Sequence, residues 1–333
     1  MAEAEVLLSV RGLKTYFHTR NGILKAVDDV SFKVNRGETF GIVGESGCGK
    51  SISCLSILRL VASPPGRYEG GEILFEGRDT LKMNDAEIHA FRGGEVSIIF
   101  QEPMTALNPV YTVRNQLEEA VMLHQKVNRG EAAAIALNWI SKMRIPNPES
   151  ILKSYPFVLS GGMRQRVMIA MALACKPKLL IADEPTTALD VTIQAQILDL
   201  INAIKEETSV SCIFISHDLA VISEMADRVM VMYGGRVCET ADTDKLISNP
   251  LHPYTRGLIN SRPGKKNAQK RLKAIPGNVP SLKDMPPGCP FHPRCQEFTD
   301  QCRVGFPPMF ETAPPGGKSH TVACWKYGEK SHV

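Results

Sequence analysis

The sequence lacks any apolar run of about 18 residues, the length that a membrane-spanning helix needs. It has little net charge, +4 at pH 7 over 333 residues, and so does not predict a dedicated nucleic-acid surface. Its first residues, Met-Ala-Glu-Ala-Glu, show neither the basic start nor the apolar core of a secretory signal. We therefore expect a cytosolic protein with no membrane span and no nucleic-acid partner.

The length and composition predict a large domain with an appendage. A chain of 333 residues with 43% hydrophobic content is longer than one compact unit usually is. We expect the large domain over residues 1–250 and the appendage over residues 251–333, where prolines become frequent and aliphatic residues few. Prolines also punctuate helical patterns over residues 102–165, which predicts an inserted helical subdomain. Strands are expected at residues 6–10, 26–34, 69–77 and 96–100, and a hairpin at residues 228–240.

The pattern G-x-x-x-x-G-K-[ST] occurs between an apolar run at residues 39–43 and a helical pattern at residues 52–60. In this setting the loop N–H groups and the helix N-terminus attract the phosphates of a nucleotide. Lys50 can reach the terminal phosphates, and the Ser51 hydroxyl can take one ligand position on Mg²⁺. A chance match in a glycine-rich turn is the alternative. The expected nucleotide-binding residues of this phosphate loop are Gly44, Glu45, Ser46, Gly47, Cys48, Gly49, Lys50 and Ser51.

Two further apolar runs end in polar side chains. Residues 179–182 lead directly into Asp183 and Glu184, and residues 211–216 lead into His217. In parallel sheets, ligands bind at the carboxyl ends of the strands. Asp183 can therefore hold Mg²⁺ through water, Glu184 can orient or deprotonate the attacking water, and His217 can contact a γ-phosphate. The alternatives are a polar strand exit for the acids and a structural role for the histidine.

A second anion-binding helix end is expected at Ser160, Gly161, Gly162 and Met163. Ser160 is a good helix cap, and the two glycines leave the first backbone N–H groups uncovered. An ordinary capped helix start would look the same. The aromatic residue Phe17, or Tyr16 as second choice, could stack on an adenine ring; packing on its own sheet is the alternative.

Four of the nine cysteines cluster in the appendage, as Cys289, Cys295, Cys302 and Cys324. None of them forms the C-x2–4-C pair that is usual in zinc sites. Wider spacings are compatible with an iron–sulfur cluster, while free or disulfide-forming thiols and zinc remain open. A segment so poor in aliphatic residues needs such a staple, because it cannot build much core of its own.

The motifs in this order resemble the ATP-binding subunits of ATP-binding-cassette importers, in particular the oligopeptide/dipeptide branch. The resemblance covers residues 6–250, and the segment after Pro250 resembles the extension of that branch. It implies an α/β fold: a RecA-like P-loop core with an antiparallel β subdomain, an inserted helical subdomain and a small Cys/Pro-rich C-terminal extension. The family signature usually ends in Gln where this chain has Met163; the serine and both glycines are kept, so activity is still expected.

The resemblance also assigns roles and partners. It implies Mg²⁺ held through Ser51, Gln101 and Asp183, with Glu184 as the catalytic base and His217 as the γ-phosphate sensor. Residues 160–163 would bind the nucleotide of a partner ATPase, Asp190 would end the loop after the acids, and Phe17 would stack on adenine. The four tail cysteines would bind a [4Fe-4S] cluster of structural role. The expected partners are a second, different ATPase subunit, two transmembrane permease subunits and an extracytoplasmic peptide-binding protein.

On this basis we expect an ATPase that energises peptide import from the cytoplasmic face of a membrane, with ATP and Mg²⁺ as cofactors. Three alternatives stay open. The chain could serve a related importer of nickel or another small solute. It could be a soluble cassette ATPase acting on nucleic acid or ribosomes, although it has no long coiled-coil insertion or second cassette. A non-catalytic subunit is the third, against which Glu184 and His217 argue.

Overall fold

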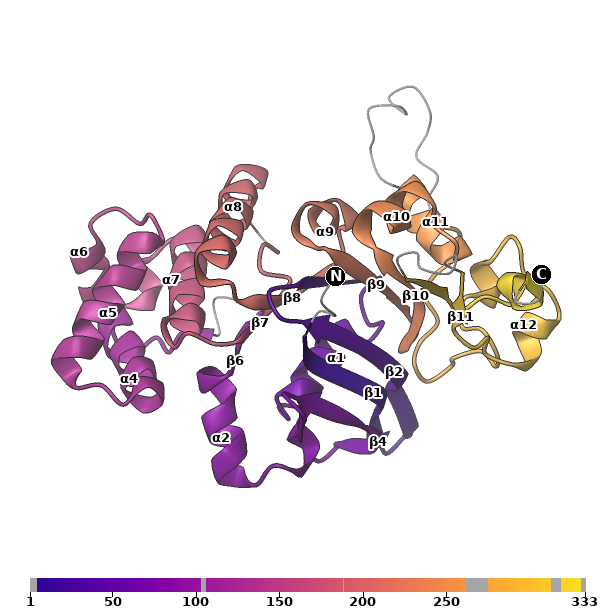
Figure 1. Ribbon diagram of the computed structural model, residues 1–333, viewed down its shortest axis with the longest axis horizontal. Helices are drawn as coiled ribbons and strands as arrows, with labels where there is room; N and C mark the ends of the chain where they lie inside the picture. The colour runs from indigo at the N-terminus through magenta and orange to yellow at the C-terminus, as the bar shows by residue number, and fades with distance from the viewer. Residues whose placement is uncertain (1–4, 103–105, 188, 262–274, 313–318, 331–333) are drawn as a thin grey trace. The chain divides into compact units, whose positions relative to one another are not determined.

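The computed structural model describes residues 5–102, 106–187, 189–261, 275–312 and 319–330 (Figure 1). The basic run at residues 265–271, whose charges favour a solvated face or a linker, lies outside the described residues. The chain divides into two compact units. The first comprises residues 1–5, 35–38 and 82–215, and the second comprises residues 6–34, 39–81 and 216–333.

The first unit contains three parallel strands, β6 (Val96–Ile99), β7 (Leu179–Asp183) and β8 (Ser211–Ser216). The central strand β7 places Ile181 opposite Ile98 on one side and Ile213 on the other. All five residues of β7 are buried, as its continuous apolar run predicts for a parallel strand covered on both faces.

Helices α4, α5 and α6 of this unit lie within the segment expected to be an inserted subdomain, residues 102–165, whereas α7 begins in that segment and continues to Ala174 (Figure 1). Helix α5 packs against α4, α6 and α7 through Ala132, Ala136, Trp139 and Ile140. Its start is fixed by a capping box in which Asn128 and Glu131 bond each other's backbone N–H groups. The helices of the unit are α2 (Asp85–Gly94), α4 (Val113–Gln125), α5 (Arg129–Lys142), α6 (Pro148–Lys153), α7 (Gly161–Ala174) and α8 (Val191–Thr208).

The second unit contains two sheets. The first has the strand order β2-β1-β4-β5, with β1 antiparallel to β4 and β4 antiparallel to β5. Its first two strands are longer than the apolar alternation predicts, because pairing continues through residues that are only partly buried. The strands are β1 (Val6–Thr19), β2 (Gly22–Asn35), β4 (Gly66–Phe75) and β5 (Arg78–Asp79).

In the other sheet of this unit, β3 (Thr39–Val43) runs parallel to β9 (Arg228–Tyr233), which forms the predicted hairpin with β10 (Arg236–Asp242). The C-terminal extension adds two strands beyond β10: β12 (His320–Val322) pairs with β10, and β11 (Phe310–Glu311) pairs with β12. The extension therefore takes structural support from the sheet edge, which its composition did not predict. The helices of this unit are α1 (Lys50–Ile57), α9 (Leu219–Met225), α10 (Thr243–Ser248), α11 (Pro253–Asn260) and α12 (Gln301–Val304).

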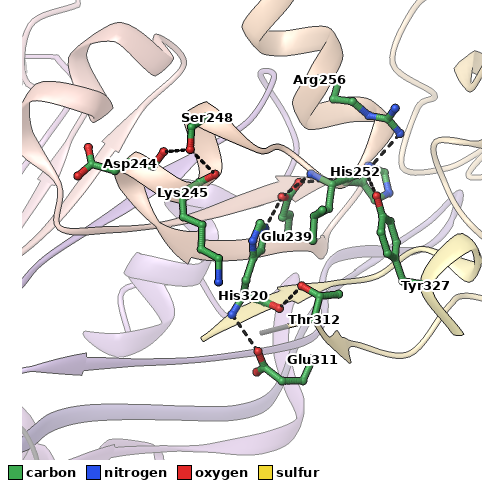
Figure 2. Close-up of polar contacts among 11 residues, drawn as sticks. Glu239, Asp244, Lys245, Ser248, His252, Arg256, Glu311, Thr312, His320 and Tyr327 are labelled. Atoms are coloured by element: carbon green, nitrogen blue, oxygen red, sulfur yellow. Dashed lines mark hydrogen bonds and ion pairs between the residues drawn. The ribbon is translucent and has the colours of Figure 1, made fainter. Parts of the chain in front are cut away.

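A fully buried carboxylate, Glu239 of β10, joins the extension to this sheet (Figure 2). One oxygen accepts hydrogen bonds from the Leu251 N–H, at 2.8 Å, and from His320 Nε2, at 2.7 Å. The other oxygen accepts from the His252 N–H at 2.9 Å. A buried carboxylate is tolerated only where such donors replace water, so these contacts fix the start of α11 and strand β12 against β10.

Burial of His252 makes this region sensitive to acid. Its Nδ1 accepts a hydrogen bond from the Tyr254 N–H at 3.1 Å and so caps α11. Burial lowers the pKa of His252 from 6.5 to about 4, since the charged imidazolium loses its water. As the pH falls, His252 is therefore protonated in the unfolded chain before it is protonated in the folded protein. The stability that neutral His252 contributes above pH 6.5 is lost as the pH falls towards 4.

We predict that His252→Asn, which keeps a capping side chain, lowers stability at neutral pH but flattens this acid dependence. Between pH 7.5 and 4.5 the wild type should lose about 2.5 kcal/mol more of its free energy of unfolding than the variant. Urea unfolding at several pH values measures the difference. The exposed His89 supplies the control, and His89→Asn should follow the wild type. Equal losses in His252→Asn and the wild type would contradict the prediction.

Candidate active site

The phosphate loop lies between the buried strand β3 and helix α1. Gly49 stands immediately before the helix with φ 101°, and no side chain caps the first turn of α1. A Cβ at Gly44 would lie 2.3 Å from the Met232 carbonyl oxygen, and one at Gly49 would lie 2.4 Å from that of Ala26. Only glycine fits such close backbone contacts, so both motif glycines are required by the fold of the loop.

The Lys50 side chain folds back over this loop. Its Nζ donates hydrogen bonds to the carbonyl oxygens of Gly44, at 2.8 Å, and Glu45, at 3.2 Å, and lies 3.9 Å from Cys48 Sγ. The lysine is buried. Its positive charge and the helix N-terminus therefore belong to one small region of the second unit, as anion binding requires.

The acidic pair follows β7 in the first unit, and the structure brings Glu184 together with Gln101. Glu184 Oε2 accepts hydrogen bonds from Gln101 Nε2, at 3.1 Å, and from Thr187 Oγ1, at 3.0 Å. The Glu184 N–H donates to the Ile215 carbonyl at 3.0 Å, and its φ of 45° turns the chain sharply after Asp183. The Glu184 carboxylate, which is expected to be catalytic, is thus held in place by its neighbours.

Sequence reasoning missed Thr187, which has no motif of its own. The only signal is its position three residues after the acid. Its hydroxyl and the Gln101 amide both donate to Oε2 of Glu184. These two hydrogen bonds fix the orientation of the carboxylate.

The predicted signature begins helix α7. Ser160 Oγ accepts a hydrogen bond from the Met163 N–H at 3.3 Å, which confirms Ser160 as the cap. Ser160 and Gly161 are exposed, and nothing lies within 4 Å of a Cβ placed at Gly161. The first turn of α7 is therefore open to a ligand approaching from outside.

Other predicted residues have local roles in the structure. Asp190 caps α8 by accepting from the Ile193 N–H at 2.9 Å. His217 is exposed directly after β8, in the second unit with the phosphate loop. Tyr16 Oη donates to Asp28 at 2.5 Å, and burial together with this bond raises the pKa of Tyr16. Phe17 is half-buried, and its contact with adenine stays a prediction.

The four tail cysteines lie near one another in the second unit. The Cys289 N–H donates to the Cys302 carbonyl at 2.8 Å. Burial raises the pKa of Cys289 to about 12, and charge repulsion from the thiolates of Cys302, Cys295 and Cys324 adds to the shift. All nine cysteines are free thiols. In the described part of the chain, no group of three or more His, Cys, Asp or Glu is arranged to hold a metal ion.

The arrangement of the tail cysteines differs from the one expected for a bound metal cluster. Among the residues that the structure describes, the four thiols are not arranged to hold a metal ion. Beyond the spacing of these cysteines in the sequence, the structure adds only that they lie near one another.

No helix in the described ranges is long and apolar enough to span a membrane.

Comparisons with known proteins bear on the same segments. The family described as ABC transporter matches residues 27–187, which contain the phosphate loop, the signature and the acidic pair. The family described as oligopeptide/dipeptide transporter, C-terminal region, matches residues 238–302.

Full-length relatives extend the match to the whole chain. A probable peptide ABC transporter ATP-binding protein of Sinorhizobium fredii is 49% identical over 98% of this chain and 97% of its own length. Bacillus subtilis has an oligopeptide transport ATP-binding protein that is 48% identical over 97% of this chain and 98% of its own, and a dipeptide transport ATP-binding protein that is 46% identical over 98% and 96%.

A solved structure of a dimeric ATP-binding cassette in a post-hydrolysis state, bound to ADP and phosphate, confirms the expected P-loop cassette fold, while the Cys/Pro-rich C-terminal extension stays a prediction. It has a TM-score of 0.64 and 25% identity, and it covers 71% of this chain and 98% of its own. The chain therefore belongs to the ABC transporter family, as an ATP-binding-cassette ATPase of the type that carries the oligopeptide/dipeptide transporter C-terminal region.

Proposed function

We propose that this ATPase powers the import of peptides through a membrane ABC transporter, from the cytoplasmic face. Its relatives over nearly the whole chain are described as peptide, oligopeptide and dipeptide transport ATP-binding proteins. The proposed partners are a second, different ATPase subunit, two transmembrane permease subunits and an extracytoplasmic peptide-binding protein. The observation that carries the catalytic part is Glu184, held by Gln101 and Thr187 at the end of β7.

In this proposal the phosphate loop binds the triphosphate of ATP, and Lys50 exchanges its bonds to the loop carbonyls for the terminal phosphates. Ser51, Gln101 and Asp183 would hold Mg²⁺, whose charge offsets that of the phosphates. Glu184 orients a water and takes its proton while the water oxygen bonds to the γ-phosphorus and the bond to the β-phosphate oxygen breaks. His217 donates a hydrogen bond to the γ-phosphate.

The signature would act on a partner's nucleotide. The open first turn of α7 presents N–H groups after Ser160, which suits a phosphate carried by another subunit. Residues 160–163 of one ATPase would close over the phosphate loop of the other, with Asp190 near the contact. A related cassette described as dimeric in a post-hydrolysis state supports this arrangement.

The tail thiols are proposed to bind a [4Fe-4S] cluster that holds the extension together; the alternatives are no metal or zinc. The Cys289 N–H donates to the Cys302 carbonyl at 2.8 Å, so these two residues are neighbours in the structure, which supports a shared ligand. Cysteine thiolates are the usual ligands of such clusters. Because no metal-binding group is preformed in the described residues, the thiols would have to draw together when the cluster forms.

We predict that Glu184→Gln lowers ATP turnover at least about 100-fold and leaves nucleotide binding intact, because the amide cannot accept the proton from water. In the presence of the partner subunit, the variant should accumulate as an ATP-bound dimer. Phosphate release and size-exclusion chromatography measure the two effects. Glu207→Gln, on the exposed end of α8, is the control and should hydrolyse ATP normally. Unchanged turnover in Glu184→Gln would remove Glu184 from the mechanism.

For the tail, anaerobic purification should yield about four iron and four sulfide per chain. Replacing Cys295 and Cys302 by Ser should abolish this content, whereas Cys212→Ser, a buried thiol of β8 outside the tail, should retain it. Zinc in place of iron, or no metal under anaerobic conditions, would contradict the cluster.

The transport assignment is tested by purifying the chain together with the products of neighbouring genes. We expect two permease subunits and a second ATPase to co-purify. In proteoliposomes, ATP hydrolysis should rise when a peptide-loaded binding protein is added and should not rise with nickel or sugars. Stimulation by one of those solutes instead of peptides would overturn the substrate class and leave the ATPase intact.

A further inference from the structure

Arg294 of the C-terminal extension reaches the phosphate loop within the second unit. Its Nη1 donates to Glu45 Oε2 at 2.7 Å, and its Nη2 donates to Glu45 Oε1 at 3.1 Å. This is a two-pronged contact between a guanidinium and a carboxylate, the strongest geometry for such a pair. Glu45 is the second residue of the phosphate loop, so the extension forms hydrogen bonds directly with this loop.

Arg294 donates two further hydrogen bonds. Its Nε donates to the Pro276 carbonyl at 2.8 Å, and Nη1 also approaches Tyr233 Oη at 3.2 Å. The Arg294 side chain is only 5% exposed. Although burial lowers the pKa of the guanidinium, its bonds to Glu45 and Tyr233 raise that pKa overall. A buried charge with this bonding holds its partner firmly, because losing the partner would leave the charge unpaired.

Glu45 is held at three points. Arg294 bonds its carboxylate, the Glu45 N–H donates to Tyr254 Oη at 2.9 Å, and the Glu45 carbonyl accepts from Lys50 Nζ at 3.2 Å. Tyr254 is fully buried. Its ring packs edge-on against Tyr233, with 4.7 Å between centroids, and lies tilted against Phe291 of the extension, with 5.3 Å between centroids. The start of the phosphate loop therefore rests on a buried platform built from β9, α11 and the extension.

The pair also has an electrostatic consequence. A carboxylate beside a phosphate-binding loop repels the triphosphate. Arg294 places a positive charge on both oxygens of Glu45, which offsets this repulsion while leaving Lys50 available for the phosphates.

We propose that Arg294 is a positioning residue of the nucleotide site, which holds Glu45 and neutralises it, so that the C-terminal extension sets the affinity of the phosphate loop for nucleotide. The inference rests on the proposed nucleotide binding by this loop. Since coupling between two sites is reciprocal, bound nucleotide must also stabilise the docking of the extension.

The experiment measures the Kd of Mg-ADP, which is not hydrolysed, by calorimetry on the full chain. Arg294→Gln should raise Kd roughly tenfold, because a lost charge-assisted contact is worth about one power of ten or more. Arg294→Lys keeps the charge without the two-pronged geometry and should lie between this variant and the wild type. The double variant Glu45→Gln/Arg294→Gln removes both charges and should bind more tightly than Arg294→Gln alone.

Arg256→Gln is the matched control. Arg256 also lies in the C-terminal part of the chain and forms an ion pair with Glu297 at 2.8 Å; its hydrogen bonds within the described residues go to Glu297 and the Leu251 carbonyl and not to the phosphate loop. Its Kd should equal that of the wild type. Thermal unfolding shows which variants fold; should Arg294→Gln fail to fold, Arg294→Lys is compared with Arg256→Lys in its place.

A folded Arg294→Gln variant that binds Mg-ADP within twofold of the wild type would overturn the inference. Where Arg294→Gln does not fold, an Arg294→Lys variant that binds Mg-ADP as tightly as Arg256→Lys would overturn it. A double variant no tighter than Arg294→Gln would overturn the charge-offset part. Failure of the proposed nucleotide site gives a different pattern, in which the wild type does not bind Mg-ADP or Lys50→Ala binds as well as the wild type.

Discussion

The phosphate loop depends on backbone packing closer than any side chain allows. Gly44 lies against the Met232 carbonyl of β9, and Gly49 lies against the Ala26 carbonyl of β2. A Cβ added at these glycines would lie only 2.3 Å and 2.4 Å from the respective carbonyl oxygens. The Gly235 N–H also donates to the Cys48 carbonyl at 3.1 Å. The loop is thus shaped by two neighbouring strands before any ligand arrives, and its N–H groups need little rearrangement to receive phosphate.

The C-terminal extension follows a different principle, because it has little apolar core of its own. It is attached through the exposed edge of β10, where β12 completes the ladder, and through buried charged groups. Glu239 and Arg294 both lose their water, and each regains hydrogen bonds only in one arrangement of the chain around it. Burial of such groups adds little net stability but penalises other arrangements, so the extension docks in one way.

Local signals in the sequence predicted the core elements correctly. An apolar run that ends in glycine, in carboxylates or in a histidine identifies β3, β7 and β8. The continuous apolar run of a parallel strand that is buried on both faces can be recognised without knowing which strands it pairs with. Ser160 as the cap of α7 and the hairpin at Gly234 were predictable for the same reason, since only near neighbours in sequence decide them.

What the sequence did not predict depends on contacts between distant residues. Strand β12 pairs with β10 across about 80 residues, and Arg294 meets Glu45 across 249. No local pattern marks either partner: β12 has three residues, and Arg294 stands among prolines and cysteines whose own chemistry suggests a ligand site. Thr187 was missed because a single hydroxyl near an acid is common, and only its 3.0 Å contact with Glu184 gives it meaning.

These contacts imply that the extension and the phosphate loop behave as one structural element. The platform under Glu45 contains Tyr233 of β9, Tyr254 of α11 and Phe291 of the extension, whose rings contact one another. Displacing the extension would expose Phe291, leave Arg294 without its carboxylate and free Glu45 to face the anion site. Each of these changes is unfavourable by itself. They occur together because one short segment, residues 289–295, carries both the Phe291 ring and the Arg294 guanidinium. A segment attached in this way cannot be a passive appendage to the ATPase.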